Sequence, residues 1–553
     1  MKFVTRHLRR QDALLAFVAL AMCLLYVRTA DGGFPLDDAW IHQVYGRNLA
    51  LTGQWAFVPG VPSAASTSPL YTVLLSIGYR LNVPFQLWTH GLGALALIIT
   101  AMVGSRMATR LLPGRSGVGL AAGLALAVSW HLVWAATSGM ETMLFGMWTL
   151  VLIGISLTPK SPLRGERGLS ESVLLPLSLW RGGWGVRLHG ILFGALAALA
   201  TLTRPEGIVL AGMIGLVVLI VRPQGTWRGF AVWAVGAALA FGVVIAPYLA
   251  LNLQLTGGLL PDTAAAKQTQ FAQLLQLPYL ARVLRLLTPL SAGGQLLLVP
   301  GAVVLVVILM KQFTTEAQRE EETKNRGVAG AGYIPSLYTA RWQALFDLLP
   351  LAWAGTLVLL YAARLPTDYQ HGRYVIPALP AFIVFGVVGT ARLLTISRGL
   401  LPRVLSRTLA ISAGLAFVYF ALLAGPTVYR QDVNIIDQEM VTAARWVAAN
   451  IPPEETLAVH DIGALGYFAP RPILDLAGLV NPEIVPFIND AEPLWAWLQQ
   501  NDARYLMAFP DQIPGDDPRD PRLCEVFTTG GTASPAAGGP NMAVYALAWD
   551  GSC

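Results

Sequence analysis

The sequence predicts a polytopic α-helical membrane protein that ends in a water-soluble α/β domain. Of its 553 residues, 55% are hydrophobic and 13% are charged, whereas an average soluble domain has roughly 25% charged residues. The apolar residues gather in runs of the length, about 20 residues, that crosses roughly 30 Å of hydrocarbon. Charge also divides the chain, since residues 1–425 hold 32 Lys and Arg against 15 Asp and Glu, and residues 426–553 hold 6 against 17. This composition excludes a disordered chain, a small disulfide scaffold and an ordinary cytosolic enzyme.

Eleven apolar runs predict eleven membrane spans within residues 1–425. If the N-terminus is cytoplasmic, the cytoplasmic loops hold 23 Lys and Arg and the outer loops hold 8. This bias favours that orientation, and an odd number of spans then places residues 426–553 outside the cytoplasm. The first run follows a basic N-terminus without a small-residue cleavage site, so we expect an uncleaved anchor. The runs lie near 12–30, 87–105, 117–136, 141–158, 189–203, 206–221, 229–250, 292–310, 345–362, 375–391 and 408–425.

The C-terminal region, residues 426–553, alternates helical and strand patterns. An amphipathic helix is expected near 438–450 and another helix at 492–500, with strands at 457–461, 472–476, 504–509 and 541–548. Such alternation predicts a small α/β domain. Asp461 and Asp475 end successive strands, where they either bind a ligand or cap a turn. Cys524 and Cys553 also lie here and are free to pair outside the cytoplasm.

Ionisable residues collect at the outer ends of the predicted spans. The first outer loop, residues 31–86, opens with Asp37 and Asp38, and four later outer turns add further charges. Ionisable groups near a bilayer are costly unless they are paired or hydrated, so their convergence on one surface predicts a functional site. The residues of the later turns are Glu141, Arg204, Glu206, Asp262, Lys267, His371 and Arg373.

Several of these residues also have a plainer interpretation. Arg204 and Glu206 would suit a structural ion pair, Glu141 would suit a helix N-terminus, and His371 would suit a hydrogen-bonded loop. For Asp37 and Asp38 we favour a function, because the amphipathic pattern that follows them predicts a helix along the membrane surface that holds a carboxylate at the interface.

Two tryptophans stand near the outer surface. Trp130 and Trp134 lie one helical turn apart, and we interpret them as part of the interfacial aromatic belt rather than as a platform for a sugar.

Common catalytic motifs are missing from the sequence. It holds no GxxxxGK[ST] phosphate loop, no HExxH or paired CxxC metal pattern and no GxSxG elbow. No basic run is interleaved with stacking aromatic residues, so nucleic acid is not an expected partner. Nucleotide donors are scarce outside the cytoplasm, so a transfer there needs a donor that already carries its activation, such as a sugar on polyprenyl phosphate. A carboxylate would take the proton of the acceptor hydroxyl, and cations such as Lys267, Arg204 and Arg373 would bind the departing phosphate.

Seven short motifs in order resemble the GT-C superfamily of integral-membrane glycosyltransferases, and most closely the bacterial branch with the mycobacterial terminal arabinofuranosyltransferase. They are DDAWIHQVYGRNLALTGQWAFVPG, STSPLY, SGMET, TRPEG, GGLLPDTAAAK, HGRYVIPALP and VHDIGALGYFAPRPILDLAGLVNPEI. The resemblance implies a bacterial plasma-membrane enzyme that transfers a sugar with inversion from a polyprenyl-phosphate donor to a glycan, lipid or protein acceptor.

The same resemblance suggests roles for single residues. It makes Asp37 the preferred base, with Asp38 holding the acceptor or its partner carboxylate, and the two roles are open to exchange. Lys267 becomes a candidate for phosphate binding. Asp262 departs from the Asn more often found at that position, and the stretch PSAAS before Thr67 departs as well. Both departures leave the sugar open, and a divalent cation at the paired acids stays possible.

Two other functions compete with this one. A transporter or flippase of lipid-linked saccharides would place functional charges near the bilayer midplane, whereas the acids here cluster at the outer ends of spans. A structural assembly protein would explain the acidic C-terminal region but would leave Asp37 and Asp38 without a role.

Overall fold

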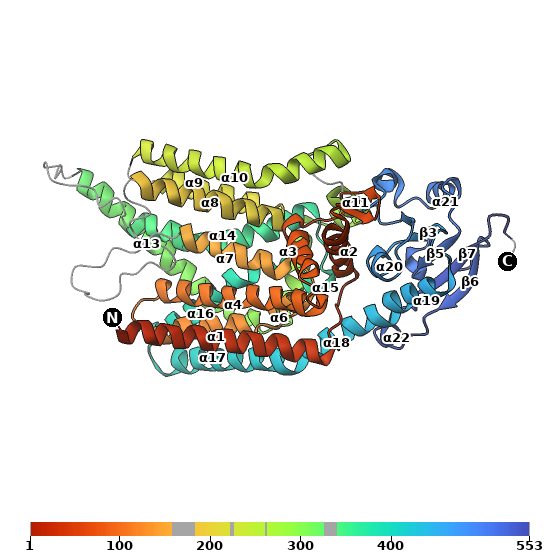
Figure 1. Cartoon of the computed structure of the whole chain (residues 1–553). Helices are drawn as coiled ribbons and strands as arrows, with labels where there is room; N and C mark the ends of the chain where they lie inside the picture. Colours follow the sequence, from red (N-terminus) through yellow and green to blue (C-terminus); the bar gives the residue numbers. More distant parts are fainter. Residues whose placement is uncertain (1, 157–182, 222–225, 260–262, 326–339, 552) are drawn as a thin grey trace.

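The computed structural model describes the whole chain except residues 1, 157–182, 222–225, 260–262, 326–339 and 552. Long helices lie side by side and form a bundle, and a mixed sheet lies beyond one end of it (Figure 1). The N-terminus lies at the opposite end of the bundle (Figure 1). We call the end nearer the sheet the sheet end.

The bundle is built mainly from helices rich in apolar residues. They are α1 (Lys2–Thr29), α4 (Phe85–Leu111), α5 (Ser116–Val128), α6 (Trp130–Thr137), α7 (Thr142–Ser156), α8 (Gly183–Thr203), α9 (Gly207–Val221), α10 (Trp227–Thr256), α13 (Val299–Asn325), α14 (Ala340–Arg364), α16 (Leu379–Ile396) and α17 (Leu400–Tyr419).

Every apolar run predicted from the sequence coincides with one of these helices or with a pair of them. Within the described part of the chain, eight helices are long and apolar enough to cross a membrane. Helices α5 and α6 form a further, broken segment that bends by 52°, and α7 and α9 are shorter apolar helices. The structure is therefore that of a membrane protein, and the number of eleven spans stays a prediction.

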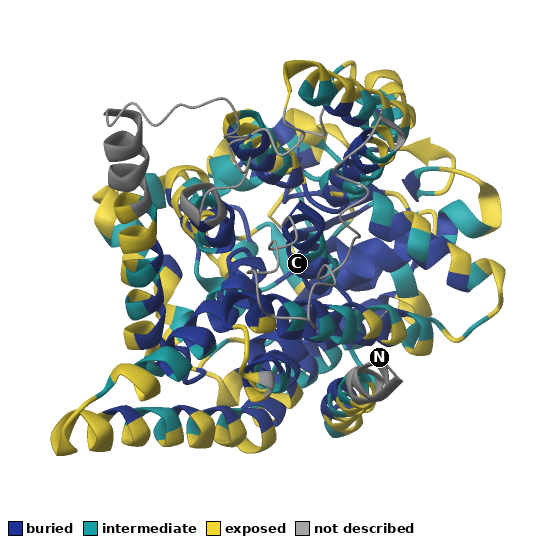
Figure 2. Cartoon of the chain, turned by 90° about the vertical axis from the view of Figure 1, so that its left-hand side faces the viewer, coloured by how far each residue is buried: buried dark blue, intermediate teal, exposed yellow. Residues whose placement is uncertain are grey.

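The outer surface of the bundle is apolar. Leu239 on α10 is 66% exposed, Val243 on the same helix is 74% exposed, and Leu415 on α17 is 66% exposed. Figure 2 shows buried residues toward the middle of the molecule and exposed ones along the outward faces of the peripheral helices. Exposed apolar patches of this extent need an apolar surrounding, which a bilayer provides.

Short helices cover the sheet end of the bundle. They are α2 (Asp37–Thr52), α3 (Pro69–Arg80), α11 (Thr263–Gln270), α12 (Tyr279–Leu287) and α15 (Tyr369–Gly372), with a hairpin of β1 (Ala56–Val58) and β2 (Val61–Pro62) after α2. Helix α2 forms where a helix was predicted, and Gly53 ends it in the left-handed conformation that favours glycine (φ 71°). The expected amphipathic surface position is wrong, because α3 and α20 (Ile462–Phe468) pack against α2 and ten of its 16 residues are buried.

The C-terminal region forms a five-stranded sheet with the order β4-β3-β5-β7-β6. Strands β3, β4 and β5 are parallel, with Val459 opposite both Asp475 and Met507, and β7 pairs antiparallel with β5 and β6. The strands are β3 (Leu457–Val459), β4 (Ile473–Asp475), β5 (Tyr505–Ala508), β6 (Leu523–Thr528) and β7 (Ala543–Leu547), and the helices of this region are α18 (Gly425–Ile436), α19 (Thr442–Asn450), α20 (Ile462–Phe468), α21 (Ala491–Gln500) and α22 (Ala533–Ala536).

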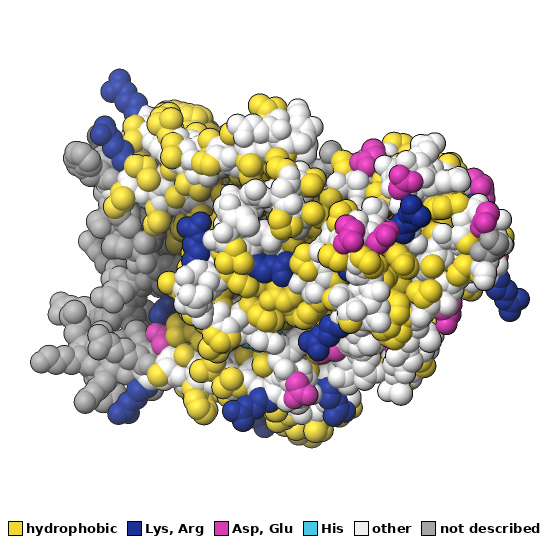
Figure 3. Space-filling model, turned by 45° about the vertical axis from the view of Figure 1, so that its right-hand side comes forward, with side chains coloured by type: hydrophobic (Ala, Val, Ile, Leu, Met, Phe, Trp, Pro, Cys, Tyr) yellow, Lys and Arg dark blue, Asp and Glu magenta, His cyan; other side chains and the backbone are white. Residues whose placement is uncertain are grey.

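Four of the five strands and the helix α21 lie within two residues of their predicted bounds. Strand β6 was not predicted, because its exposure pattern gives no clear alternation of buried and exposed residues. Cys524 on this strand is joined to Cys553 by a disulfide. In Figure 3 acidic side chains gather over the C-terminal region, whereas hydrophobic side chains cover much of the bundle.

The membrane sidedness expected from the sequence can be measured at the two ends of α4. Leu81 precedes the helix at the sheet end and is exposed, and Arg115 follows it at the other end and is exposed. In intact cells whose outer envelope admits the reagent, a maleimide that cannot cross the plasma membrane should label Leu81→Cys and not Arg115→Cys. Both variants should be labelled after detergent lysis. Labelling of Arg115→Cys alone in intact cells would contradict the proposed orientation.

Candidate active site at the sheet end of the bundle

Helix α2 presents two different faces, and the helical repeat decides which acid lies on which. Asp38, Ile41 and His42 stand at positions i, i+3 and i+4, and all three line one cavity. Asp37 lies a quarter of a turn away, does not line that cavity, and contacts helix α20. Two adjacent acids in the sequence thus face different surroundings.

Asp38 is held by cations from two distant segments. Its Oδ2 accepts a hydrogen bond from Lys267 Nζ at 3.1 Å and one from Arg373 Nη2 at 2.5 Å. Burial disfavours its charged form, but Lys267 and Arg373 outweigh this and hold the pKa of Asp38 well below its usual range. Burial likewise disfavours the charged form of Lys267, and Asp38 outweighs it and raises the pKa of that amine. Asp38 and Lys267 are therefore both ionised near neutral pH.

Arg373 receives further support from tyrosines. Its Nη2 donates to Tyr374 Oη at 3.2 Å and to Tyr369 Oη at 3.4 Å, and the side chain is 4% exposed. Its Nη1 is buried and has no hydrogen-bond partner among the described residues. An arginine with an unused donor beside a cavity can bind an anionic ligand.

A second charged cluster lies on the same cavity. Arg204 Nη1 lies 3.4 Å from Glu141 Oε1, and Arg204 Nη2 lies 3.5 Å from Glu206 Oε1 and 2.6 Å from Tyr361 Oη. Tyr361 also donates to Glu206. The Nε2 atom of His42 lies 3.2 Å from Glu141 Oε2. Burial disfavours the charged form of Glu141, but His42 and Arg204 outweigh it and lower the pKa of Glu141 to about 2.

Both clusters line one cavity of about 590 Å³. Its charged lining residues are four cations and three carboxylates, namely Arg204, Lys267, Arg364, Arg373, Asp38, Glu141 and Glu206. Its apolar wall comes from α8, α9, α10 and α14 and includes Leu202, Val209, Ile245, Leu249 and Leu360. A cavity lined by both charged and aliphatic side chains suits an amphiphilic ligand.

Asp37 is bound to the C-terminal sheet region. Its Oδ2 accepts from the backbone N–H of Gly463 at 2.6 Å, and its Oδ1 accepts from that of Ala464 at 2.8 Å. Burial, reinforced by the charge of Asp461, raises the pKa of Asp37 to about 8, although the two backbone hydrogen bonds oppose the rise. Of the two acids, only Asp38 is in a position to contact a ligand in the cavity.

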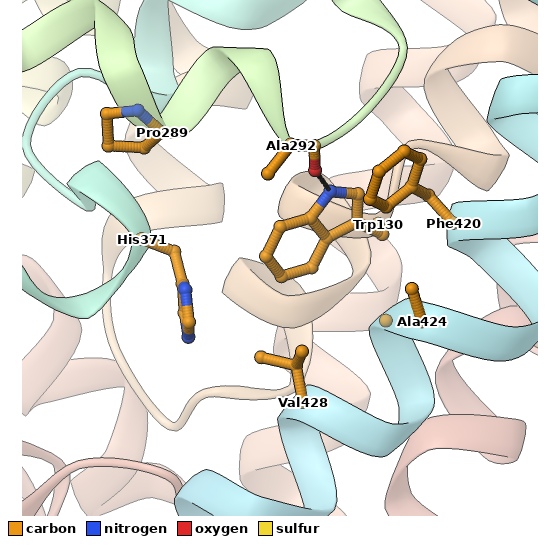
Figure 4. A pocket seen from close by; sticks show the side chains of 8 residues that line it. Trp130, Pro289, Ala292, His371, Phe420, Ala424 and Val428 are labelled. Carbon is orange, nitrogen blue, oxygen red and sulfur yellow. Dashed lines mark hydrogen bonds between the residues drawn. The ribbon is translucent and has the colours of Figure 1, made fainter. Parts of the chain in front are cut away.

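His371 belongs to a different pocket, of about 170 Å³, which Figure 4 shows together with Trp130 and Phe420. Its Nε2 lies 2.7 Å from Asp432 Oδ2, and its ring packs against Trp130 and Trp134 with 5.2 Å between the ring centroids in each case. The hydrogen-bonded loop histidine is thus the better interpretation. The interpretation of the two tryptophans as an interfacial belt is wrong, because Trp130 is 4% exposed and Trp134 is 1% exposed.

Most of the other predicted residues lie at the large cavity. The structure brings Asp38, Lys267, Arg204 and Arg373 to one cavity with Glu141 and Glu206, and Asp262 lies outside the described residues. Among the residues that are described, no group of three or more His, Cys, Asp or Glu side chains is placed to hold a metal ion. Asp475 accepts three backbone hydrogen bonds, from Ala477, Leu479 and Val480. Of the two roles considered for this residue, it therefore caps a turn and does not bind a ligand.

Sequence reasoning missed several lining residues. His42 was detectable, because it stands four residues after Asp38 and therefore lies on the same face of the predicted helix. Tyr361 and Arg364 on α14 were not, because nothing in the local sequence tells which side of a membrane helix faces a cavity, and Tyr374 lies in a turn whose conformation the sequence does not fix.

A family model for a domain of unknown function, DUF8728, matches residues 429–545. No curated protein matches the chain. Among solved structures, ArnT from Cupriavidus metallidurans in the apo state is similar, with 15% sequence identity, 98% of each chain covered and a TM-score of 0.57. The same protein bound to undecaprenyl phosphate gives a TM-score of 0.55 at 15% identity, again with 98% of each chain covered.

A third similar structure is the oligosaccharyltransferase of Archaeoglobus fulgidus tethered to an acceptor peptide. It shares 12% identity with a TM-score of 0.50, and the match covers 97% of this chain and 74% of that one. The alignments extend over nearly the whole chain, so the bundle and the sheet region are matched together. The chain therefore has the fold of the GT-C glycosyltransferases.

Proposed function

We propose that this protein is a glycosyltransferase of the bacterial plasma membrane that moves a sugar from a polyprenyl-phosphate donor to a hydroxyl of an extracytoplasmic glycan, lipid or protein. The observation that carries the proposal is the position of Asp38, which lines the large cavity and shares its Oδ2 atom between Lys267 and Arg373. In this scheme the N-terminus is cytoplasmic and residues 426–553 form an extracytoplasmic domain.

The donor would contact both the charged and the aliphatic residues that line the cavity. The phosphate would bind Lys267 and the unused Nη1 donor of Arg373, and the lipid chain would lie along the aliphatic wall formed by residues such as Val209 and Leu249. A phosphate bound to these cations competes with Asp38 for them. Asp38 would then lose the charges that hold its pKa low and would become a stronger base.

The reaction that follows is a single displacement. The acceptor oxygen attacks the anomeric carbon, the bond from that carbon to the phosphate oxygen breaks, and polyprenyl phosphate leaves with the electron pair. Asp38 takes the proton of the acceptor hydroxyl. Lys267 and Arg373 stabilise the charge on the leaving phosphate. Attack from the side opposite to the leaving group inverts the anomeric configuration.

The remaining polar groups would hold the sugar or the acceptor. His42, Glu141, Arg204 and Glu206 offer donors and acceptors for hydroxyl groups on the same cavity. Asp37 would support the site without contacting the ligand. This exchanges the roles first preferred for the two acids, because the carboxylate oxygens of Asp37 bind backbone N–H groups of α20.

The assignment of the base is tested by comparing Asp38→Asn with Asp37→Asn. Purified protein in detergent is given a polyprenyl-phosphate sugar and an acceptor, and release of polyprenyl phosphate is measured. A general base contributes about 10²- to 10⁴-fold in typical enzymes, so Asp38→Asn should lower turnover by that factor. Asp37→Asn should keep more of the activity, because the amide is neutral and retains one acceptor for α20.

The same experiment separates the competing functions. Release that depends on the acceptor supports a transferase, whereas a transporter or flippase would move the lipid-linked saccharide without releasing polyprenyl phosphate. Full activity of Asp38→Asn would defeat the proposed base, and loss of turnover only in Glu141→Gln would assign the base to Glu141 instead.

The phosphate site is tested with Lys267→Met, which keeps most of the side-chain volume and removes the charge. A hydrogen bond to a charged group contributes about 1.5–3 kcal/mol, so the KM for the donor should rise, or kcat should fall, by about 10- to 100-fold. The Kd for polyprenyl phosphate alone, measured by the quenching of tryptophan fluorescence, should rise as well. A variant that binds polyprenyl phosphate with unchanged affinity would place the phosphate elsewhere.

The environment of Asp37 predicts a dependence of stability on pH. Its pKa rises on folding from 3.8 to about 8, so between these values the folded chain holds a proton that the unfolded chain has released. The stability of the wild type relative to Asp37→Asn should therefore fall as the pH rises from about 4 to about 8. Thermal unfolding midpoints of both proteins in detergent would show this, and a constant difference across the range would contradict it.

A further inference from the structure

One turn of the C-terminal sheet contacts both helices that carry the Asp38–Lys267 pair. The turn is residues 460–464, which follow β3 and open α20. On one side the N–H groups of Gly463 and Ala464 bind Asp37 on α2. On the other side His460 Nε2 lies 2.9 Å from Gln270 Nε2 on α11. Helix α2 carries Asp38 and helix α11 carries Lys267.

Helix α11 depends on such contacts for its position. It has eight residues, and of these only Thr263 and Ala266 are buried. Apart from the pair of Lys267 with Asp38, its hydrogen bonds to distant described residues come from His460 and from Asn489, whose Nδ2 donates to Thr269 O at 3.0 Å. A helix of this length is not stable by itself and takes its position from tertiary contacts.

The imidazole of His460 is itself fixed in place. Its Nδ1 lies 3.2 Å from Asp461 Oδ1, and Asp461 Oδ2 accepts from Gln512 Nε2 at 2.7 Å. The bond to Gln270 is compatible with either protonation state of His460, because an amide offers a donor in one orientation and an acceptor in the other.

The approach of the turn to α2 requires glycine. A Cβ atom on Gly463 would lie 2.1 Å from the backbone oxygen of Asp37, a distance that atoms do not tolerate. The backbone of the turn therefore lies directly against the start of α2.

We propose that residues 460–464 act as a clamp that sets the position of Lys267 relative to Asp38, and that His460 is a positioning residue on the Lys267 side. The expected effect of the clamp on turnover rests on the proposed function. The existence of the clamp does not depend on that function. Lysine reaches its partner through four rotatable bonds, so the helix that carries it has to be fixed first. A displacement of about 1 Å in a site of this kind can lower the rate about 10²-fold.

The clamp is tested without an activity assay by the reactivity of Lys267. The ion pair with Asp38 keeps the amine protonated and slow to react, so its rate of acetylation by acetic anhydride, measured by mass spectrometry, reports on the pair. In His460→Ala the rate should rise about 3- to 10-fold, which is the effect expected for the loss of one hydrogen bond. His460→Gln, which keeps a hydrogen-bonding group within reach of Gln270, should restore most of the protection.

A control variant comes from the same sheet. Asp520 pairs with Arg522 and shares no hydrogen bond with the described residues of α11, so Asp520→Asn should leave the acetylation of Lys267 unchanged. If His460→Ala and Asp520→Asn give the same rate as the wild type, the clamp is overturned. If the acetylation rate of Lys267 rises equally in His460→Ala, His460→Gln and Asp520→Asn, the substitutions loosen the whole region. That result would also overturn the clamp.

Turnover supplies the second readout. His460→Ala should raise the KM for the polyprenyl-phosphate donor about 3- to 10-fold and leave the KM for the acceptor unchanged. If Lys267 becomes more reactive but the wild type releases no polyprenyl phosphate, the proposed function fails and the clamp stands. If turnover is present and the KM for the donor is unchanged in His460→Ala, the positioning role is refuted.

Discussion

The site is organised by one carboxylate that is shared between two cations from distant parts of the chain. Asp38 comes from the first loop, Lys267 from a short helix about 230 positions later and Arg373 from a turn still further on. Charges buried without partners are unstable at the edge of a membrane, so each of these groups stabilises the others. The interaction thereby draws α2, α11 and the turn before α16 to one side of a single cavity.

In the proposed function, a ligand phosphate would replace the carboxylate as the partner of the cations. The cavity carries four cations and three carboxylates among its lining residues. The second cluster, in which Arg204 binds both Glu141 and Glu206, has one cation against two carboxylates and is therefore net negative. The surplus of positive charge therefore comes from the other lining residues, Lys267, Arg364 and Arg373 against Asp38 alone, and in the proposed function these cations would stabilise an anionic donor.

The two neighbouring acids on α2 connect the cavity to the C-terminal sheet region. Asp38 faces the cavity, while Asp37 binds the backbone of the sheet region through Gly463 and Ala464. The same turn contacts α11 through His460. The C-terminal region is thus attached to the membrane bundle at residues on the two helices that carry the ion pair. A movement of the sheet would therefore shift α2 and α11 and change the distance between Asp38 and Lys267.

The local features of this protein could be predicted from its amino-acid pattern. Apolar runs of membrane length defined the bundle helices, alternating patterns defined four of the five strands, and the collection of charges in outer loops identified Asp38, Lys267, Arg204 and Arg373 as residues of one region. Features that depend on helix orientation and on distant partners became visible only in the folded chain. The tertiary structure separated Asp37 from Asp38, placed His371 beside Asp432 in another pocket, buried Trp130 and Trp134, and added Tyr361, Arg364 and Tyr374 to the cavity. The reason is physical: hydropathy reports whether a segment leaves water, but the face it turns to a neighbour depends on how helices from the whole chain pack.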